Sequence, residues 1–283
     1  NETATMHCNL LTDIRIAKEV GFEGIELIHA KLYRYLMNGF TTESLISYLD
    51  GLSVVGLGFV ADIERQEEAQ YEILLEECER MCTIAESIGC RSVLLVTGPL
   101  AAGVDENPMY KGELTSSYLG LTNKSWPEIR KLTARNLRVL SDIGKRHQVE
   151  FYLESLSWTP LHTLEQTLEL LDEAAVENVG LIIDFWHHFT SGTTPDQIAR
   201  LDGNLIKAVH FCDSLPVKGK ITQELRNVWT GAGVIPLQEW VDAVKATGYD
   251  GWWSCELFSF KHYELDPWET ARNLKGLMEY LIR

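Results

Sequence analysis

The sequence predicts a single-domain α/β protein that folds as a (β/α)8 barrel. Three segments share one pattern, in which an amphipathic helix ends at a glycine, a short link follows, and an apolar strand begins. They are AKEVGFEGIEL, AESIGCRSVLLV and KATGYDGWWSCEL. A helix that leads straight into another buried strand is half of a parallel-sheet repeat. Eight such units within 283 residues are typical of one closed barrel.

Seven segments have the length and composition of buried strands. Several are continuous runs of Val, Ile and Leu, which suit a sheet that is covered on both faces. They are Gly24–Ile28, Leu52–Val60, Ser92–Val96, Glu150–Glu154, Gly180–Asp184, Ile206–Phe211 and Trp252–Leu257. The opening residues NETAT resemble the tail of one more strand, so we expect a first strand that is truncated at Asn1.

The segments between the strands carry helical periodicity. Apolar residues recur at three- and four-residue steps from Tyr71 to Ala85, and less regularly from Leu132 to Ile143. A doubly wound open sheet is the alternative arrangement, but the sequence lacks the glycine-rich phosphate-binding turn that usually accompanies it. No linker or low-complexity segment divides the chain, so we expect one domain over residues 1–283.

Composition argues against several classes of function. The chain has 41 acidic and 25 basic residues, and the resulting formal charge of −16 repels phosphate backbones, so nucleic acid is not expected as a partner. No apolar stretch approaches the roughly 20 residues that span a bilayer. The six cysteines include no C-x-x-C pair and are typical of reduced core thiols. We therefore expect a cytoplasmic protein without a membrane partner.

Two connections are unusually long, and both follow strands. Residues 99–127 include the aromatic residues Tyr110, Tyr118 and Trp126, and residues 214–236 include Lys218, Lys220, Arg226 and Trp229. Long loops in compact domains are often functional. In a barrel both loops would overhang the carboxyl ends of the strands, where active sites form.

Four of the predicted strands close on a carboxylate or an imidazole. Glu154, Asp184, His210 and Glu256 occupy this position on the fifth to eighth strands. In a barrel these strand ends converge on one spot, which gives three carboxylates and one imidazole. Such an oxygen-rich set suits Mn²⁺, Mg²⁺ or Co²⁺ better than a soft-ligand zinc site, although Zn²⁺ is also compatible.

A single glutamate at a strand end is more often a solvated terminus than a ligand. Ionised carboxylates are rarely buried without a partner, however, and these four residues share one register, so we expect a metal site. His187 follows Asp184 at D-x-x-H spacing and is expected above the metal, while its neighbour His188 is expected to pack elsewhere. Asp213 is either a partner of a metal ligand or a helix cap.

The motifs resemble those of the xylose-isomerase-like TIM-barrel superfamily. They are the IEL around Glu26, the strand that ends at Glu154, the D-x-x-H motif, the V-H-F-x-D segment and the final Glu256. This superfamily includes ketose 3-epimerases, hydroxypyruvate isomerases, inosose dehydratases and the endonuclease IV branch. The likeness covers nearly the whole chain in order. The endonuclease branch is the weaker match, because it requires additional histidine ligands for three zinc ions.

The resemblance implies one divalent metal ion, with Mn²⁺ as the first choice, bound by Glu154, Asp184, His210 and Glu256. It implies that the two glutamates also act as the acid/base pair. It further implies a small sugar or cyclitol as the partner, and barrels of this kind commonly form homo-oligomers.

Several other residues are candidates for contact with the substrate. The resemblance assigns His187 and a basic residue after the seventh strand to this role, and Glu26 lies in the matching IEL motif. Arg226 lies further from His210 than the epimerase pattern suggests, and Lys218 and Lys220 intervene, so the choice among these three stays open. Trp158, Tyr110 and Trp229 could stack on a sugar face, and packing in the core or at the surface is the alternative for each.

The expected function is a divalent-metal-dependent isomerase or epimerase of a polyhydroxy carbonyl compound. One glutamate would remove a proton beside the carbonyl, and the other would return it through a metal-stabilised enediolate. A lyase that dehydrates an inosose, or that eliminates a substituent from a 3-keto-glycoside, is the alternative on the same site. A non-catalytic sugar-binding or subunit protein is the second alternative, but both glutamates of the acid/base pair are present.

Overall fold

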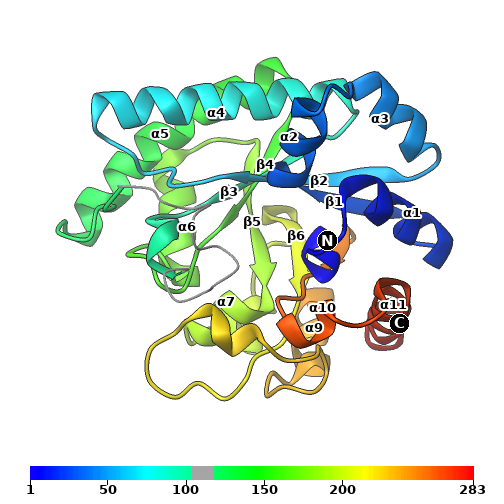
Figure 1. Ribbon diagram of the computed structural model, residues 1–283. Helices are drawn as coiled ribbons and strands as arrows, with labels where there is room; N and C mark the ends of the chain where they lie inside the picture. The colour runs from blue at the N-terminus through cyan, green and yellow to red at the C-terminus, as the bar shows by residue number, and fades with distance from the viewer. Residues whose placement is uncertain (104–117) are drawn as a thin grey trace.

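The structure is a computed structural model, and it describes residues 1–103 and 118–283. Within these residues, seven parallel strands form one sheet in the order β1-β2-β3-β4-β5-β6-β7, and helices surround it in a nearly closed barrel (Figure 1). This arrangement confirms the predicted α/β barrel. Among the described residues, no helix is long and apolar enough to cross a membrane.

The strands are short, and they match the predicted segments to within two residues at each end. They are β1 (Gly24–Ile28), β2 (Ser53–Val60), β3 (Ser92–Val96), β4 (Glu150–Glu154), β5 (Val179–Asp184), β6 (Ile206–Phe211) and β7 (Trp253–Cys255).

The α-helices are α1 (Leu10–Val20), α2 (His29–Met37), α3 (Thr42–Leu49), α4 (Glu68–Ser87), α5 (Trp126–Arg146), α6 (Leu164–Ala174), α7 (Phe185–Thr190), α8 (Pro195–Ile198), α9 (Leu237–Ala246), α10 (Phe260–Tyr263) and α11 (Pro267–Ile282). Short 3₁₀ helices are η1 (Glu2–Thr5), η2 (Leu100–Gly103), η3 (Gly203–Leu205) and η4 (Gln223–Arg226).

Apolar side chains pack on both sides of the sheet. Outside the barrel, one cluster joins β1–β4 to the first five helices, and a second joins β5–β7 to α7, α9 and α11. Inside the barrel, a smaller cluster fills the space between the strands; it contains Leu94, Val96, Tyr152, Leu156, Ile182 and Ala208. Burial on both faces explains why the strands read as continuous apolar runs in the sequence.

Strand register brings the polar strand ends to one level. Val96 lies opposite Glu154, and Asp184 lies opposite His210. The backbone N–H of Glu256, one residue beyond β7, donates to the carbonyl of Phe211 at 3.1 Å. The carboxyl ends of β4 to β7 therefore present their polar side chains at one edge of the barrel.

The opening residues differ from the prediction. Residues Glu2–Thr5 form the 3₁₀ helix η1 and not the tail of a strand, because the Asn1 side chain caps the turn by accepting from Thr3 N at 2.9 Å. The N-terminal segment lies beside β1 (Figure 1), where the Asn1 side chain donates to Glu26 of β1 and the Thr3 hydroxyl accepts from the backbone N–H of Leu257, two residues beyond β7. Between these strands and helices α1 and α11 lies an opening of about 850 Å³, which Asn1 also lines.

Candidate metal centre

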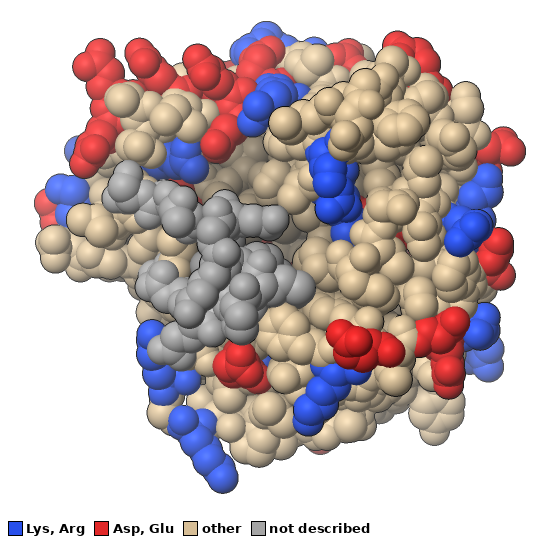
Figure 2. Space-filling view, in the orientation of Figure 1, with Lys and Arg blue, Asp and Glu red and all other residues tan. Residues whose placement is uncertain are grey.

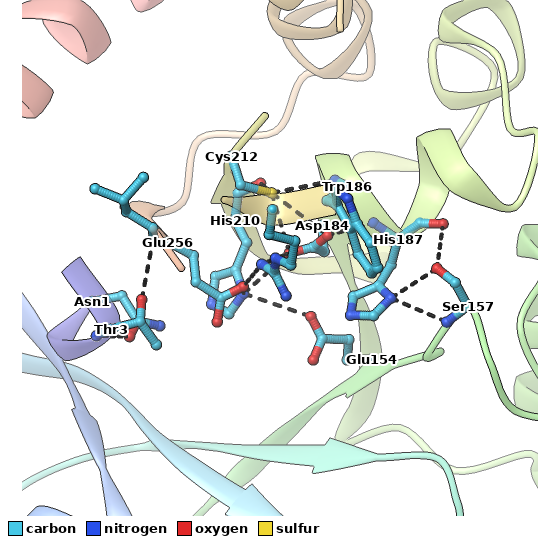
Figure 3. Close-up of polar contacts among 12 residues, drawn as sticks. Asn1, Thr3, Glu154, Ser157, Asp184, Trp186, His187, His210, Cys212 and Glu256 are labelled. Carbon is cyan, nitrogen blue, oxygen red and sulfur yellow. Dashed lines mark hydrogen bonds and ion pairs between the residues drawn. The ribbon is translucent and has the colours of Figure 1, made fainter. Parts of the chain in front are cut away.

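Four side chains converge at the carboxyl ends of neighbouring strands. Glu154 ends β4, Asp184 ends β5, His210 lies on β6, and Glu256 follows β7. One potential ligand atom from each lies within 4.8 Å of all the others, and all four residues are buried. Figure 3 shows these side chains pointing toward one another from their separate strands.

His210 presents one ring nitrogen to the three carboxylates. Its Nδ1 lies 3.7 Å from Glu154 Oε1, 3.6 Å from Asp184 Oδ2 and 3.6 Å from Glu256 Oε2. Neither this Nδ1 nor Glu154 Oε1 has a hydrogen-bond partner, although both atoms are buried. Buried polar atoms without partners are rare in native proteins. A divalent metal ion would satisfy both, so the residues present fit such an ion.

Burial and neighbouring charges shift the pKa values of the three carboxyl groups in different directions. Burial raises the pKa of Glu154 to about 7, and the nearby Asp184 and Glu256 charges add to this against the opposing effect of His210. Burial also raises the pKa of Glu256, in spite of Arg226. The Asp184 carboxyl is equally buried, but Arg226 and His210 hold its pKa below the usual range. Of the three carboxyl groups, the two glutamates are therefore the ones whose pKa is shifted upward.

Glu26 on β1 supports His210 from the opposite side. His210 Nε2 donates to Glu26 at 2.9 and 3.0 Å from its two oxygens. The same oxygens accept from Tyr152 Oη and Asn1 Nδ2, each at 2.8 Å. Burial would raise the pKa of Glu26, but the charge and hydrogen bond of His210 outweigh it and lower the pKa to about 2. In the structure the Glu26 carboxylate faces His210, and its expected contact with the substrate stays a prediction.

Tyr152 is a site residue that the sequence analysis did not single out. It lies two residues before Glu154 on the same strand, so the alternation of side chains along a strand directs both into the barrel. Gly56 on β2 makes room for it, since a Cβ at this position would lie 2.5 Å from Tyr152 Oη and 3.1 Å from Glu26 Cγ. The period-two pattern of FYLE was the signal that could have identified Tyr152.

The D-x-x-H spacing has a local structural reason. Asp184 is the N-cap of helix α7, and its Oδ1 accepts from the backbone N–H of His187 at 2.6 Å. His187 Nδ1 in turn accepts from the backbone N–H of Ser157 at 3.0 Å, so the neutral ring carries its proton on Nε2. Burial lowers the pKa of His187 to about 3, which keeps the ring neutral. His187 thus offers an N–H donor beside Glu154 (Figure 3).

Two neighbours of His187 have different surroundings: His188 packs in the core, and Trp158 lies against the His187 ring. His188 packs as expected, because its Nε2 lies 3.2 Å from the carbonyl of Ile182 and its Nδ1 lies 3.3 Å from Thr193 Oγ1. The Trp158 ring lies 5.2 Å from the His187 ring, and its buried indole Nε1 has no hydrogen-bond partner. A substrate hydroxyl could accept from this donor.

The structure brings Arg226 into the site and leaves Lys218 and Lys220 exposed. Arg226 is 4% exposed, and its guanidinium makes an ion pair with Glu256 and lies 3.6 Å from Asp184 Oδ2. The guanidinium carbon also lies over the rings of Trp186 and Phe258, at 5.0 and 4.4 Å from their centroids. Of the three basic residues left open by the sequence, Arg226 is therefore the one placed beside the acidic cluster.

Asp213 shapes the loop that carries Arg226. Its carboxylate accepts from the backbone N–H groups of four loop residues at 2.8–3.1 Å, and they are Ser214, Gly231, Gly233 and Ile235. The hydrogen-bond partners of Asp213 thus lie in the loop. They are neither a metal ligand nor the start of a helix, which were the two partners considered for Asp213. In the same loop the Trp229 ring packs against the His262 ring at a tilt of 42°, with centroids 4.5 Å apart, while Tyr110 lies outside the described residues.

Comparisons with known proteins agree with this fold. The model of the xylose isomerase-like TIM barrel family matches residues 14–281. The chain is 27% identical to an inosose isomerase of Bacillus velezensis, over 100% of this chain and 95% of that one. It is also 27% identical to a 3-dehydroshikimate dehydratase of Bacillus anthracis, over 81% of this chain and 76% of that one. A crystal structure of IOLI protein with a zinc atom matches with a TM-score of 0.87 and 24% identity, covering 100% and 96% of the two chains.

Proposed function

The chain belongs to the xylose isomerase-like TIM barrel family, and we propose that it is a divalent-metal-dependent isomerase of a cyclic polyhydroxy ketone of the inosose type. The protein is an enzyme of the isomerase or dehydratase kind. One observation carries the finer proposal. Glu154 and Glu256 come from strands that are not neighbours, face the same His210 nitrogen at 3.7 and 3.6 Å, and both have a raised pKa.

Glu154, Asp184, His210 and Glu256 would hold the metal ion. When bound there, the ion would acidify the C–H bond next to a carbonyl that it coordinates. Three carboxylates and one imidazole favour Mn²⁺ among divalent ions, and Zn²⁺, Mg²⁺ and Co²⁺ are the alternatives to be compared.

The two glutamates can move the ketone by one carbon. One glutamate carboxylate removes the proton from the hydroxyl-bearing carbon beside the carbonyl. The electron pair of that C–H bond forms a carbon–carbon double bond, and the π electrons of the carbonyl move to its oxygen, which gives an enediolate. The other glutamate, in its acid form, returns a proton to the former carbonyl carbon, while the hydroxyl proton of the first carbon passes to the neighbouring oxygen. Return of the proton to the original carbon from the opposite face would give an epimer instead.

Residues around the glutamates would bind and orient this substrate. The His187 Nε2–H and the indole N–H of Trp158 can donate to its oxygens, since the Ser157 contact fixes the tautomer of His187. Arg226 is positioned to contact an oxygen next to Glu256. Lys218 is exposed, so its predicted role in substrate binding stays a prediction.

Dehydration of a carboxylated ring, as the dehydratase relatives' name implies for them, is the second candidate. A substrate carboxylate needs a cation that is available to pair with it. His210 would be neutral as a metal ligand, so among the side chains in the described part of the site the buried cation is Arg226, and it already pairs with Glu256 and Asp184. This charge balance favours a neutral substrate, and thus an inosose-like ketone over 3-dehydroshikimate.

Deuterium exchange tests the proposed function. The purified protein with Mn²⁺ or Zn²⁺ is incubated in D₂O with inososes, ketoses, 3-keto-glycosides and 3-dehydroshikimate, and NMR spectra are recorded after chelation of the metal. We expect deuterium at the carbons beside the carbonyl, together with an isomerised ketone. Glu154→Gln and Glu256→Gln should each reduce turnover at least about 10²-fold. Glu150→Gln, at the exposed start of β4, is the matched control.

Near-normal turnover in either glutamate variant would show that the acid/base assignment is wrong. If 3-dehydroshikimate loses water and no neutral ketone incorporates deuterium, the protein is a dehydratase and the proposed isomerase function is wrong. The predicted cytoplasmic location and homo-oligomeric state are separate proposals, and light scattering of the purified protein tests the second.

A further inference from the structure

A second pocket lies at the barrel rim, away from the four metal-site residues. It encloses about 410 Å³ and is lined by residues that follow β1, β2 and β3 and by the facing sides of α2 and α4. Its volume is within the roughly 300–1,000 Å³ of typical ligand pockets. Acidic and basic side chains gather over α4 at the top of Figure 2, above a hollow in this face.

One wall of this rim pocket is polar and preformed. Arg65 is 7% exposed, and its Nη2 lies 3.7 Å from Asp62 Oδ2 and 3.4 Å from Glu77 Oε2. The Nε of this guanidinium is buried and has no hydrogen-bond partner. Leu100 N donates to Asp62 Oδ1 at 2.7 Å, which holds the Asp62 carboxylate, and Asn136 Nδ2 donates to the carbonyl of Arg65 at 2.8 Å, which holds the backbone that carries Arg65.

The opposite wall is aromatic. The His29 ring meets Phe59 edge-on with centroids 4.6 Å apart, and it meets Tyr33 edge-on at 5.6 Å. The guanidinium of Arg80 lies over the Tyr33 ring at 4.6 Å from its centroid. Aromatic rings opposite a fixed set of donors and acceptors are the features that bind an apolar ring face and its polar edge together.

The charges of the pocket balance. Arg65 and Arg80 supply two positive charges, and Asp62 and Glu77 supply two negative charges. The two carboxylates would repel an anion such as phosphate, and the two guanidinium groups would repel a cation. A hydroxyl group both donates and accepts, so a ring that carries several hydroxyls can use all four side chains.

We propose that the rim pocket between α2, α4 and the ends of β1 to β3 is a binding site for a neutral polyhydroxylated ring, separate from the metal centre. None of the four metal-site residues lines the rim pocket, and its lining residues Phe59, Ala61 and Leu100 also pack against the apolar cluster inside the barrel. Binding there requires no metal ion and no turnover, and it does not depend on the proposed isomerase activity.

Methionine methyl groups provide a local probe of this binding. The chain has five methionines, of which Met81 lines the rim pocket and Met278 lines the separate opening between β1 and β7. The metal-free full chain, labelled with ¹³C at the methionine methyl groups, is titrated with myo-inositol and separately with methyl β-D-glucopyranoside. We expect the Met81 resonance, assigned with Met81→Leu, to shift saturably while the Met278 resonance stays in place.

Variants at the exposed part of the pocket connect this shift to the proposed contacts. Arg80→Gln and Glu77→Gln should each weaken binding of the probe by about tenfold, since a hydrogen bond to a charged group contributes roughly that factor. Arg272→Gln, an equivalent change on the exposed face of α11, should leave binding unchanged. Asp184→Asn, in the metal centre, should also leave it unchanged.

Two results would overturn the proposal. One is a Met81 resonance that stays fixed with both probes while the unliganded chain is folded. The other is a Met81 shift that survives in Arg80→Gln and Glu77→Gln but disappears in Asp184→Asn, because the ring would then bind at the metal centre. Failure of the isomerase assay affects neither measurement.

Discussion

Glu26→Gln tests how the barrel orients its histidine ligand. The substitution keeps the size of the side chain but removes the charge that faces His210 Nε2 at 2.9 and 3.0 Å. It also replaces one of the two carboxylate oxygens, each of which accepts hydrogen bonds, with an amide NH₂ group that can only donate. His210 would then be held less firmly with Nδ1 toward the other ligands, and metal affinity should fall.

The expected loss follows from two independent magnitudes. Changes to the hydrogen-bond partner of a metal-bound histidine typically cost about 10–100-fold in metal affinity, which corresponds to roughly 1.4–2.8 kcal/mol. A hydrogen bond to a charged group contributes about 1.5–3 kcal/mol, which is the same range. Tyr152→Phe removes a neutral donor to Glu26 and leaves the carboxylate, so it should cost at most about tenfold.

Competition between the protein and a chelating dye for Zn²⁺ measures this affinity directly. Thermal unfolding of the metal-free proteins serves as the control for folding, and Glu150→Gln serves as the control for loss of a surface carboxylate. The order of affinities should be wild type, then Tyr152→Phe, then Glu26→Gln. A Glu26→Gln protein that is folded and binds Zn²⁺ as tightly as the wild type would refute the role of Glu26 as a positioning residue.

Two further changes test the packing and the acidity of buried groups. Gly56→Ala should lower the free energy of unfolding by about 1–3 kcal/mol, since its Cβ would lie 2.5 Å from Tyr152 Oη; an unchanged midpoint in urea would contradict this. Burial and the neighbouring Asp62 raise the pKa of Glu64 from 4.5 to about 7, so the stability from its bound proton is present below pH 4.5 and is lost as pH rises through 7. The free energy of unfolding of Glu64→Gln, measured in urea, should therefore rise relative to that of the wild type by up to about 3 kcal/mol between pH 5 and pH 8. If the free energies of unfolding of the two proteins change with pH in parallel, the assignment is wrong.

The strands were predictable because most are largely apolar runs between turn residues. Segments such as Ser92–Val96 and Ile206–Phe211 have the same bounds in the sequence analysis and in the structure. The short opening segment had no such run, and a side-chain cap from Asn1 decides its conformation. Local hydrogen bonds of this kind compete with strand formation and are difficult to detect in five residues.

The convergence of the four acidic and imidazole strand ends was predictable from barrel topology alone. The partners of those side chains were not, because they depend on contacts across the barrel. Glu26 and His210 are 184 residues apart, and only the folded barrel shows that they hydrogen-bond. Likewise, the sequence could not choose among the three basic residues after β6, because the path of the loop depends on the backbone contacts of Asp213.

The opening between β1 and β7 has a practical consequence for handling the protein. Asn1 lines this opening and donates to Glu26, which in turn accepts from His210, so the first residue is two hydrogen bonds from a candidate metal ligand. Any peptide joined to Asn1 must leave from a position beside this relay. Metal affinities should therefore be compared only between proteins that carry the same segment before Asn1.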